Sequence, residues 1–183
     1  MGIMKGENDD KELHSTGRRV YSFSEQLAKG EAYEDGLDTF FSKWFDIEPV
    51  PMSLQRQGID RVFTTRVTKK FPYPTRYTVE YKADEKAGDT GNAFIETVSV
   101  LSRDGEGEPE KVGWAVSSVA QILVYYLPTL GEVFTVDMSV LKRRLPEWSL
   151  YPTGTCWNRE YSSRGILVPL PYLLSVSNWQ ARL

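Results

Sequence analysis

Apolar and polar residues alternate with period two along residues 75–83, and residues 59–67 form a second segment with the composition of a strand. Both segments are rich in β-branched and aromatic residues, and a proline-containing stretch, 69–74, separates them. This pattern predicts two strands joined as a hairpin. In the second strand the odd-numbered residues share one face, so Glu80 and Lys82 project together from the other, about 7 Å apart along the strand.

Elsewhere the periodicity predicts both helices and strands. Apolar residues recur at helical spacing at Leu27, Tyr33, Leu37, Phe40, Phe41 and Trp44, which predicts a helix that runs through Phe45 and is stopped by Pro49 and Pro51. Downstream we expect a strand over 93–101, a short helix in 112–120, a hairpin from 122–127 and 132–136, a helix over 138–145 ended by Pro146, a loop at 151–155, and a short strand at 165–170. This order favours an α+β (mixed α/β) fold, with a central mixed β-sheet flanked by helices.

The length of 183 residues is typical of one domain, which we expect over 21–183 after a flexible tail of residues 1–20. No apolar run of 18 residues and no signal peptide are evident, so we expect a soluble, cytoplasmic protein without membrane contact. The chain has one cysteine, Cys156, and one histidine, His14. These counts argue against disulfides, cysteine-based zinc sites and Ser-His-Asp catalysis. Carboxylates and lysine remain as the candidate catalytic groups.

Charge is unevenly distributed along the chain. Residues 1–50 carry eleven acids against six Lys or Arg, whereas residues 60–86 carry seven Lys or Arg against four acids. A local basic surface beside carboxylates suits contact with a nucleic-acid backbone. The candidates for this contact are Arg61, Arg66, Lys69, Lys70 and Lys86.

Asp60 begins the first predicted strand, twenty residues before Glu80. If the hairpin brings Asp60 beside Glu80 and Lys82, two hard oxygen ligands and one amine meet at one point. Such a set can hold Mg²⁺, or Mn²⁺ as a substitute, and activate a water for attack on a phosphodiester.

This arrangement resembles the PD-(D/E)XK nuclease superfamily, although Ile59 stands where the family signature has proline. The resemblance implies a restriction-endonuclease-like core of αβββαβ order and a metal-dependent nuclease, acting as endonuclease or exonuclease on nucleic acid, with DNA favoured. It also implies that Asp60 and Glu80 are metal ligands and that Lys82 is the catalytic lysine. In resolvase-like members a Gly-x-x-x-Glu step on the first helix directs an acid at the metal. Gly30 to Glu34 matches this step, which makes Glu34 a third catalytic and metal-binding candidate.

Two further acids are accessory candidates. Glu31 competes with Glu34 on the same helix, and Glu96 shares a strand face with apolar residues, so it needs a partner such as Lys82 or the metal shell.

Two other function classes stay open. A non-catalytic module of the same fold would bind nucleic acid or protein and keep the charged residues as an ion-pair cluster. An unrelated hydrolase with paired carboxylates, such as a glycosidase, has no use for the neighbouring lysine. A homodimer is compatible with each of these classes.

Overall fold

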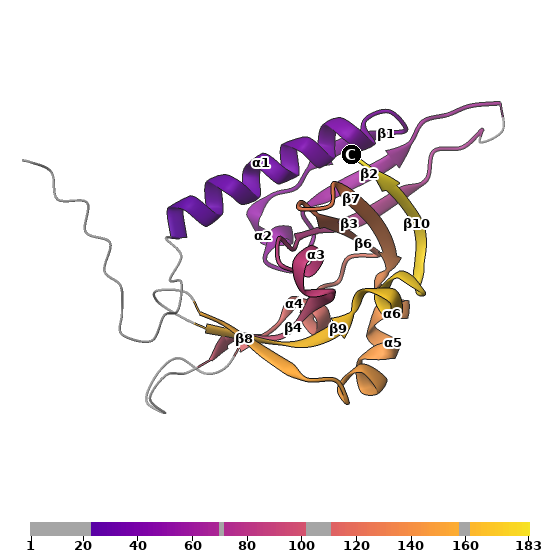
Figure 1. Ribbon diagram of the computed structural model, residues 1–183. Helices are drawn as coiled ribbons and strands as arrows, with labels where there is room; N and C mark the ends of the chain where they lie inside the picture. Colours follow the sequence, from indigo (N-terminus) through magenta and orange to yellow (C-terminus); the bar gives the residue numbers. More distant parts are fainter. Residues whose placement is uncertain (1–22, 70–71, 102–110, 158–161) are drawn as a thin grey trace, which may run out of the picture.

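The computed structural model describes residues 23–69, 72–101, 111–157 and 162–183. The fold is mixed α+β, with a central mixed sheet, a second sheet and flanking helices, which confirms the predicted class (Figure 1). The predicted N-terminal tail, 1–20, lies outside the described residues. No helix in the described ranges combines the length and the apolarity that crossing a bilayer demands.

The main sheet has six strands. In spatial order they are β1 (Phe45–Pro49), β2 (Arg61–Thr65), β3 (Arg76–Ala83), β6 (Ile122–Leu127), β7 (Glu132–Asp137) and β10 (Ser177–Arg182). Strands β3 and β6 pair in parallel, and the other neighbours pair antiparallel. Both predicted hairpins, β2–β3 and β6–β7, are therefore confirmed.

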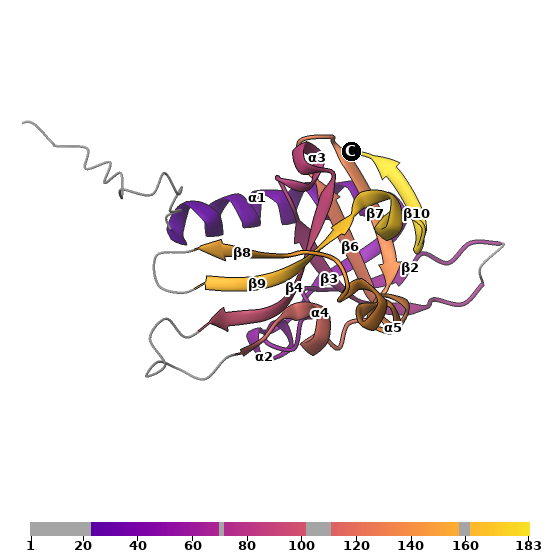
Figure 2. The same ribbon diagram turned by 60° about the horizontal axis from the view of Figure 1, so that its bottom comes forward.

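A second, four-stranded sheet is entirely antiparallel. Its order is β5 (Lys111–Val112), β4 (Asn92–Leu101), β9 (Ser162–Pro169) and β8 (Thr153–Trp157). Figure 2 shows β4, β9 and β8 lying side by side in this sheet. Because β3 and β6 are parallel, the chain must cross over between them, and β4 and β5 belong to that connection.

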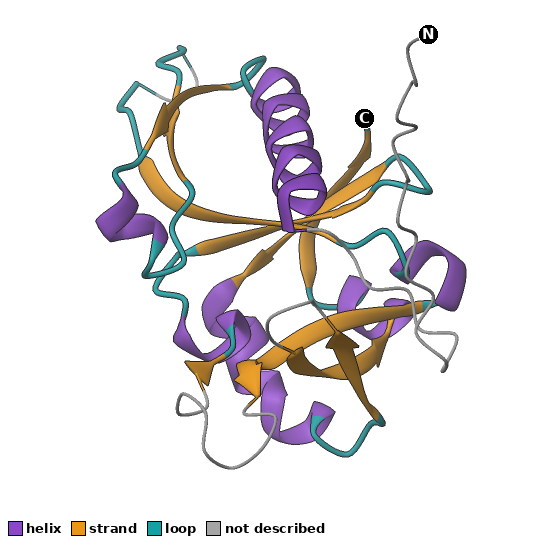
Figure 3. Cartoon of the chain, turned by 90° about the vertical axis from the view of Figure 1, so that its left-hand side faces the viewer, coloured by secondary structure: helices purple, strands orange, loops and turns teal. Residues whose placement is uncertain are grey.

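The helices are distributed over both faces of the main sheet. They are α1 (Phe23–Phe41), α2 (Met52–Gln55), α3 (Ala87–Thr90), α4 (Trp114–Ser117), α5 (Met138–Trp148) and α6 (Leu170–Leu174). In Figure 3 the long helix α1 lies against one face of the main sheet, and the second sheet lies on the opposite side. Asp137 begins α5 by accepting hydrogen bonds from the backbone N–H groups of Ser139 and Val140.

The two larger hydrophobic cores of the described residues follow from this layering. Between α1 and the main sheet, Leu37 and Phe41 pack on Phe63, Val79 and Tyr81. Between the main sheet and the second sheet, a larger core buries residues of β4, β6, β7, β9 and α5. The odd-numbered residues of β3 thus enter the first core, and Glu80 and Lys82 face the second sheet.

The structure corrects several expected boundaries. Helix α1 ends at Phe41, and Phe45 begins the edge strand β1, which ends at Pro49, where a missing N–H is tolerated. The loop expected at 151–155 contains the start of β8, and α5 continues past Pro146 to Trp148. The strand expected at 93–101 exists as β4 but belongs to the second sheet, so it is not the third strand of the main sheet.

Candidate active site

Asp60 is fixed beside β3 by two backbone contacts. Its N–H donates to the carbonyl of Val79 at 2.8 Å, and its Oδ2 accepts from the N–H of Tyr81 at 2.7 Å. Tyr81 lies between Glu80 and Lys82 in the sequence, so the Asp60 carboxylate lies next to both residues. The hairpin thus places Asp60 beside the part of β3 that carries Glu80 and Lys82.

Glu80 is almost completely buried, with 2% of its surface exposed. Its Oε1 pairs with the Lys82 ammonium at 2.7 Å, and its Oε2 has no hydrogen-bond partner among the residues that the structure describes. A buried carboxylate oxygen without a partner carries a full desolvation cost. The fold therefore keeps this oxygen in place at the expense of stability.

Gly58 and Ser118 enclose that oxygen. A Cβ added to Gly58 would lie 2.3 Å from Glu80 Oε2 and 2.6 Å from the Ser118 Cβ, and Gly58 has a φ of 76°. The Ser118 hydroxyl donates to the Gly58 carbonyl at 2.8 Å, which ties the two walls together. Only glycine fits this position, both because of its left-handed backbone and because of the space required.

Lys82 is the cation at the centre of the site, and its side chain is 33% exposed. Burial lowers the pKa of Lys82, but the negative charges of Glu80, Asp60 and Glu96 outweigh burial and raise it above its usual value. The Trp114 ring lies below the ammonium, 5.8 Å from Nζ to the ring centroid. The acidic neighbours of Lys82 therefore favour its protonated form.

Glu96 extends to this site from the second sheet. Its carboxylate interacts with the hydroxyls of Ser163 and Ser99 and with the backbone N–H of Trp114. Burial raises the pKa of Glu96, and the charge of Lys82 opposes the rise. The charges of Glu96 and Lys82 therefore interact between the two sheets, while the ion pair of Lys82 is with Glu80.

Glu34 belongs to a different network. It pairs with the Arg61 guanidinium at 3.0 Å, and Arg61 also pairs with Asp38 at 2.9 Å. Asp38 in turn accepts from the Tyr81 hydroxyl at 2.8 Å. Burial raises the pKa of Glu34, Arg61 lowers it, and the nearby charge of Asp60 raises it again.

The three-carboxylate site expected from Asp60, Glu80 and Glu34 does not form. No group of three His, Cys, Asp or Glu side chains able to hold a metal occurs within the described ranges. The physical reason is that Arg61 holds Glu34 on the α1 face of the sheet, whereas Glu80 faces the second sheet. Glu31, its competitor, is exposed on α1.

Asp60 and Glu80 nevertheless fit a Mg²⁺ ion. Mg²⁺ is usually held by one or two carboxylates and keeps several waters, so a third acid is not required. Gly58 and Ser118 enclose Glu80 Oε2 and so fix the carboxylate, which leaves Oε1, the oxygen next to Lys82, as the atom that would bind the ion. The donor set is hard and anionic, as this ion requires.

The basic candidates for nucleic-acid contact are widely separated. Arg66 and Arg76 pair with Asp46 and Glu48, each at 3.0 Å, toward the far end of the β2–β3 hairpin, about 13–20 Å along the strands from Asp60. Lys69 is exposed on the same hairpin, Lys86 is exposed beyond β3, and Lys70 lies outside the described residues. Arg61 is buried between two acids, so it faces α1 rather than solvent.

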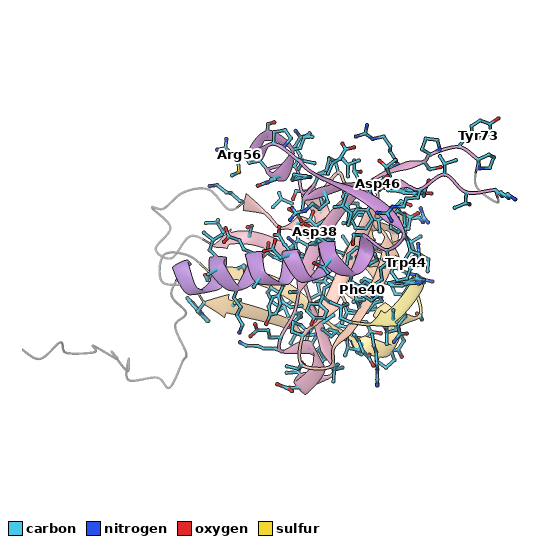
Figure 4. The ribbon with its side chains drawn as sticks, turned by 90° about the horizontal axis from the view of Figure 1, so that it is seen from above. Asp38, Phe40, Trp44, Asp46, Arg56 and Tyr73 are labelled. Carbon is cyan, nitrogen blue, oxygen red and sulfur yellow. The ribbon has the colours of Figure 1, made fainter. Side chains whose placement is uncertain are left out.

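A cavity of about 570 Å³ opens on the α1 side of the main sheet. Aromatic rings make up much of its wall, with contributions from Phe41, Trp44, Phe45, Phe63, Tyr73, Tyr77 and Trp179. In Figure 4, Trp44 lies near the C-terminal end of α1, and Tyr73 lies at the end of the hairpin that projects from the body of the molecule. The cavity is separated from Glu80 and Lys82 by the sheet itself.

Comparisons with protein-family models, curated proteins and solved structures found no match to this chain. Function must therefore be argued from the site. Sequence reasoning missed Asp38, Trp114, Ser118 and the role of Gly58. Only Gly58 carried a signal, since a glycine directly before a strand often marks a position of special backbone geometry.

Proposed function

We propose that this chain is a Mg²⁺-dependent nuclease that hydrolyses phosphodiester bonds in DNA. The observation that carries the proposal is the convergence of Asp60, Glu80 and Lys82 around one buried carboxylate. A fold that spends stability on a partnerless Glu80 oxygen gains nothing from it in packing. Such costs are typical of functional sites.

The connectivity of the main sheet supports a restriction-endonuclease-like core. Helix α1 is followed by three antiparallel strands, β1 to β3, then by a crossover that includes α4, and then by β6 parallel to β3. This order corresponds to the αβββαβ core that the sequence resemblance implies. It does so with β1 as the first strand, and the pair β4–β5 as an addition within the crossover.

Each residue of the site would have a separate role that follows from its chemistry. Asp60 and Glu80 would hold the ion, which, when bound, supplies Lewis acidity and lowers the pKa of a coordinated water. Lys82, kept protonated by its acidic neighbours, would orient that water and offset negative charge developing on the phosphate. Glu34 would act through Arg61 by fixing the backbone of Asp60, since Arg61 also donates to the Asp60 carbonyl at 2.9 Å.

One observation favours a second candidate, the non-catalytic binding module. Lys82 closes on Glu80 at 2.7 Å, as expected for an ion-pair cluster that never receives a metal. On that reading Asp60, Glu80, Lys82 and Glu96 only stabilise the contact between the two sheets.

A cleavage assay separates the two candidates. Purified wild type, Lys82→Ala and Asp60→Asn are compared on plasmid, branched and single-stranded DNA with Mg²⁺, Mn²⁺ or EDTA. We expect metal-dependent cleavage by the wild type, a loss of about 10²- to 10³-fold in Lys82→Ala, and loss of both metal binding and cleavage in Asp60→Asn. Lys43→Ala is the matched control, because this exposed lysine lies over the Phe40 ring on the α1 side. Wild type that neither binds metal nor cuts any substrate would favour the module.

A further inference from the structure

The cavity of about 570 Å³ lies on the α1 side of the main sheet, beyond the part of the sheet that α1 covers. Helix α1 ends at Phe41, and the cavity extends from there to the β2–β3 hairpin and to β10. Its floor is the sheet itself, since the buried side chains of Phe63, Val79 and Val124 line it from β2, β3 and β6. Sites for small organic ligands have volumes of about 300–1,000 Å³ and mostly apolar walls, so this cavity has the size and the character of one.

Three of the aromatic side chains that line the cavity are exposed. They come from separate segments of the chain: Trp44 follows α1, Tyr73 belongs to the hairpin, and Trp179 lies on β10. The ring centroids of Trp44 and Trp179 are 6.2 Å apart, and the two rings are inclined at 72°. A group of large exposed rings around a hollow is typical of a surface that binds a ligand, because covering the rings removes apolar area from water.

The lining of the cavity contains no charged side chain. A ligand that placed a charge inside would lose hydration and find no ion-pair partner there, which is costly. The part of the ligand that enters is therefore uncharged. Half of the lining residues are aromatic, and such walls favour a planar ring over an aliphatic chain, because stacked and edge-to-face ring pairs are stabilising beyond the area that they bury.

Polar groups in the lining can recognise the edge of such a ring. The Thr135 hydroxyl donates to Oδ1 of Asn178, so the Asn178 amide nitrogen keeps both of its N–H donors, and it has no hydrogen-bond partner among the residues that the structure describes. At the base of the hairpin, Oγ1 of Thr65 accepts from the N–H of Thr75 at 2.8 Å, so the Thr65 hydroxyl can still donate. These donors match the ring nitrogens and carbonyl oxygens on the edge of a nucleobase.

We propose that this cavity is a binding site for a nucleobase, which lies against the rings of Trp44 and Trp179 and accepts a hydrogen bond from the Asn178 amide. Stacking on aromatic rings is open to every base, since each base has a π-face. The proposal goes beyond the proposed nuclease activity and does not depend on it, because the main sheet separates the cavity from Glu80 and Lys82. The base belongs either to a free nucleoside or to a single strand, and the experiment distinguishes these two sources.

Equilibrium dialysis of the full chain in EDTA tests the site, with adenosine as the free nucleoside and a short oligodeoxyadenylate as the strand. Trp179→Ala should weaken the binding of adenosine about tenfold, because a stacking ring is lost. Asn178→Leu should weaken it about fivefold, whereas the binding of naphthalene, a planar ring without a hydrogen-bonding edge, should change less than about twofold. An affinity for the strand more than about tenfold above that for adenosine identifies a single strand as the source of the base, and a smaller difference identifies the nucleoside.

Tyr172→Ala is the matched control, since Tyr172 is an exposed ring on α6 that packs against Tyr151 and does not line the cavity. It should change adenosine binding less than about twofold. If Trp179→Ala does not fold, Trp44→Ala replaces it, with the same expected loss, because Trp44 lies outside the helices and strands.

Three outcomes would overturn the proposal. The first is that wild type binds neither adenosine nor the oligodeoxyadenylate, and the second is that neither ring variant weakens binding. The third is binding of naphthalene without binding of adenosine, which would make the cavity a purely apolar site. Because every titration is done in EDTA and no cleavage is measured, each of these outcomes leaves the proposed nuclease activity untouched.

Discussion

The two faces of strand β3 differ in what they bury: apolar side chains on one and a carboxylate on the other. On the α1 side, Val79 and Tyr81 are buried among aromatic rings, and Phe63 contacts Phe41 with centroids 5.2 Å apart. On the other side, Glu80 is equally buried but leaves one oxygen without a partner in the described structure. Burial on the α1 face of β3 therefore raises the free energy of unfolding, whereas burial of Glu80 on the other face lowers it. The first contribution can compensate for the second.

The largest effect should come from the stabilising side. Phe63→Ala removes a ring from the centre of the α1 core and should cost about 3–5 kcal/mol of unfolding free energy, through lost burial and a cavity. Urea unfolding followed by circular dichroism measures this change. Tyr73→Ala, at an 81% exposed aromatic residue on the projecting hairpin, is the control and should change stability by less than about 0.5 kcal/mol. Equal effects of the two variants would contradict the assignment of the core.

The next largest effect should come from Gly58, which packs against Glu80. Gly58→Ala should cost about 2–4 kcal/mol, because the left-handed backbone is strained and the new Cβ meets Glu80 and Ser118. Gly91→Ala is a matched control, with a φ of 70° but no neighbouring atom within 4 Å, and it should cost only about 1–2 kcal/mol. The difference between the unfolding free energies lost in the two variants measures the clash of the new Cβ with Glu80 and Ser118. A larger loss of unfolding free energy in Gly91→Ala would contradict the expected clash at Gly58.

Replacing the ion pair itself should reveal its cost directly. The double variant Glu80→Leu/Lys82→Met exchanges a poorly satisfied pair for apolar groups of similar size. Its unfolding free energy should stay within error or rise by about 1–2 kcal/mol, while any cleavage is lost. Stability measured with and without EDTA keeps bound metal from masking the gain. A loss above about 2 kcal/mol would mean that the pair stabilises the contact between the sheets, as the binding module requires.

The smallest effect on stability should come from Tyr33 on α1, and it depends on pH. Tyr33 donates to Glu85 at 2.6 Å, and burial together with this hydrogen bond raises the pKa of Tyr33 to about 12. The folded state therefore keeps a proton that the unfolded chain loses near pH 10, so the stability from this residue is full below pH 10 and falls as the pH rises to about 12. Unfolding free energies of wild type and Tyr33→Phe, measured between pH 9 and 12, should converge as the pH rises. Parallel curves would contradict the shifted pKa.

Local alternation was enough to predict the composition of the site but not its surroundings. The period-two pattern of β3 correctly placed Glu80 and Lys82 on one face, because side-chain direction in a strand is fixed by position. The same rule places Arg61 and Asp60 on opposite faces of the sheet. No local pattern, however, reveals that Arg61 would bind Glu34 and so keep Glu34 away from Asp60 and Glu80. That outcome depends on how α1 crosses the sheet.

Sheet membership was likewise beyond local reasoning. Strand β4 was predicted within one residue, but its partner β9 lies some seventy residues later. Periodicity carries no information about pairing at such a distance. Phe45 was assigned to the helix because it continues an aromatic stripe, whereas the β1–β2 pairing decides its conformation.

The pairing of β4 with β9 also sets the order in which a newly made chain can become competent. Asp60, Glu80 and Lys82 are synthesised well before Ser162–Pro169, which is the hydrogen-bonding partner of the strand that carries Glu96. Long-range strand pairing of this kind is slow and forms late. A nascent chain on the ribosome therefore carries Asp60, Glu80 and Lys82 before the second sheet that Glu80 and Lys82 face can form. The surroundings of Glu96 would then be complete only after Ser162–Pro169 has been synthesised and has paired with β4.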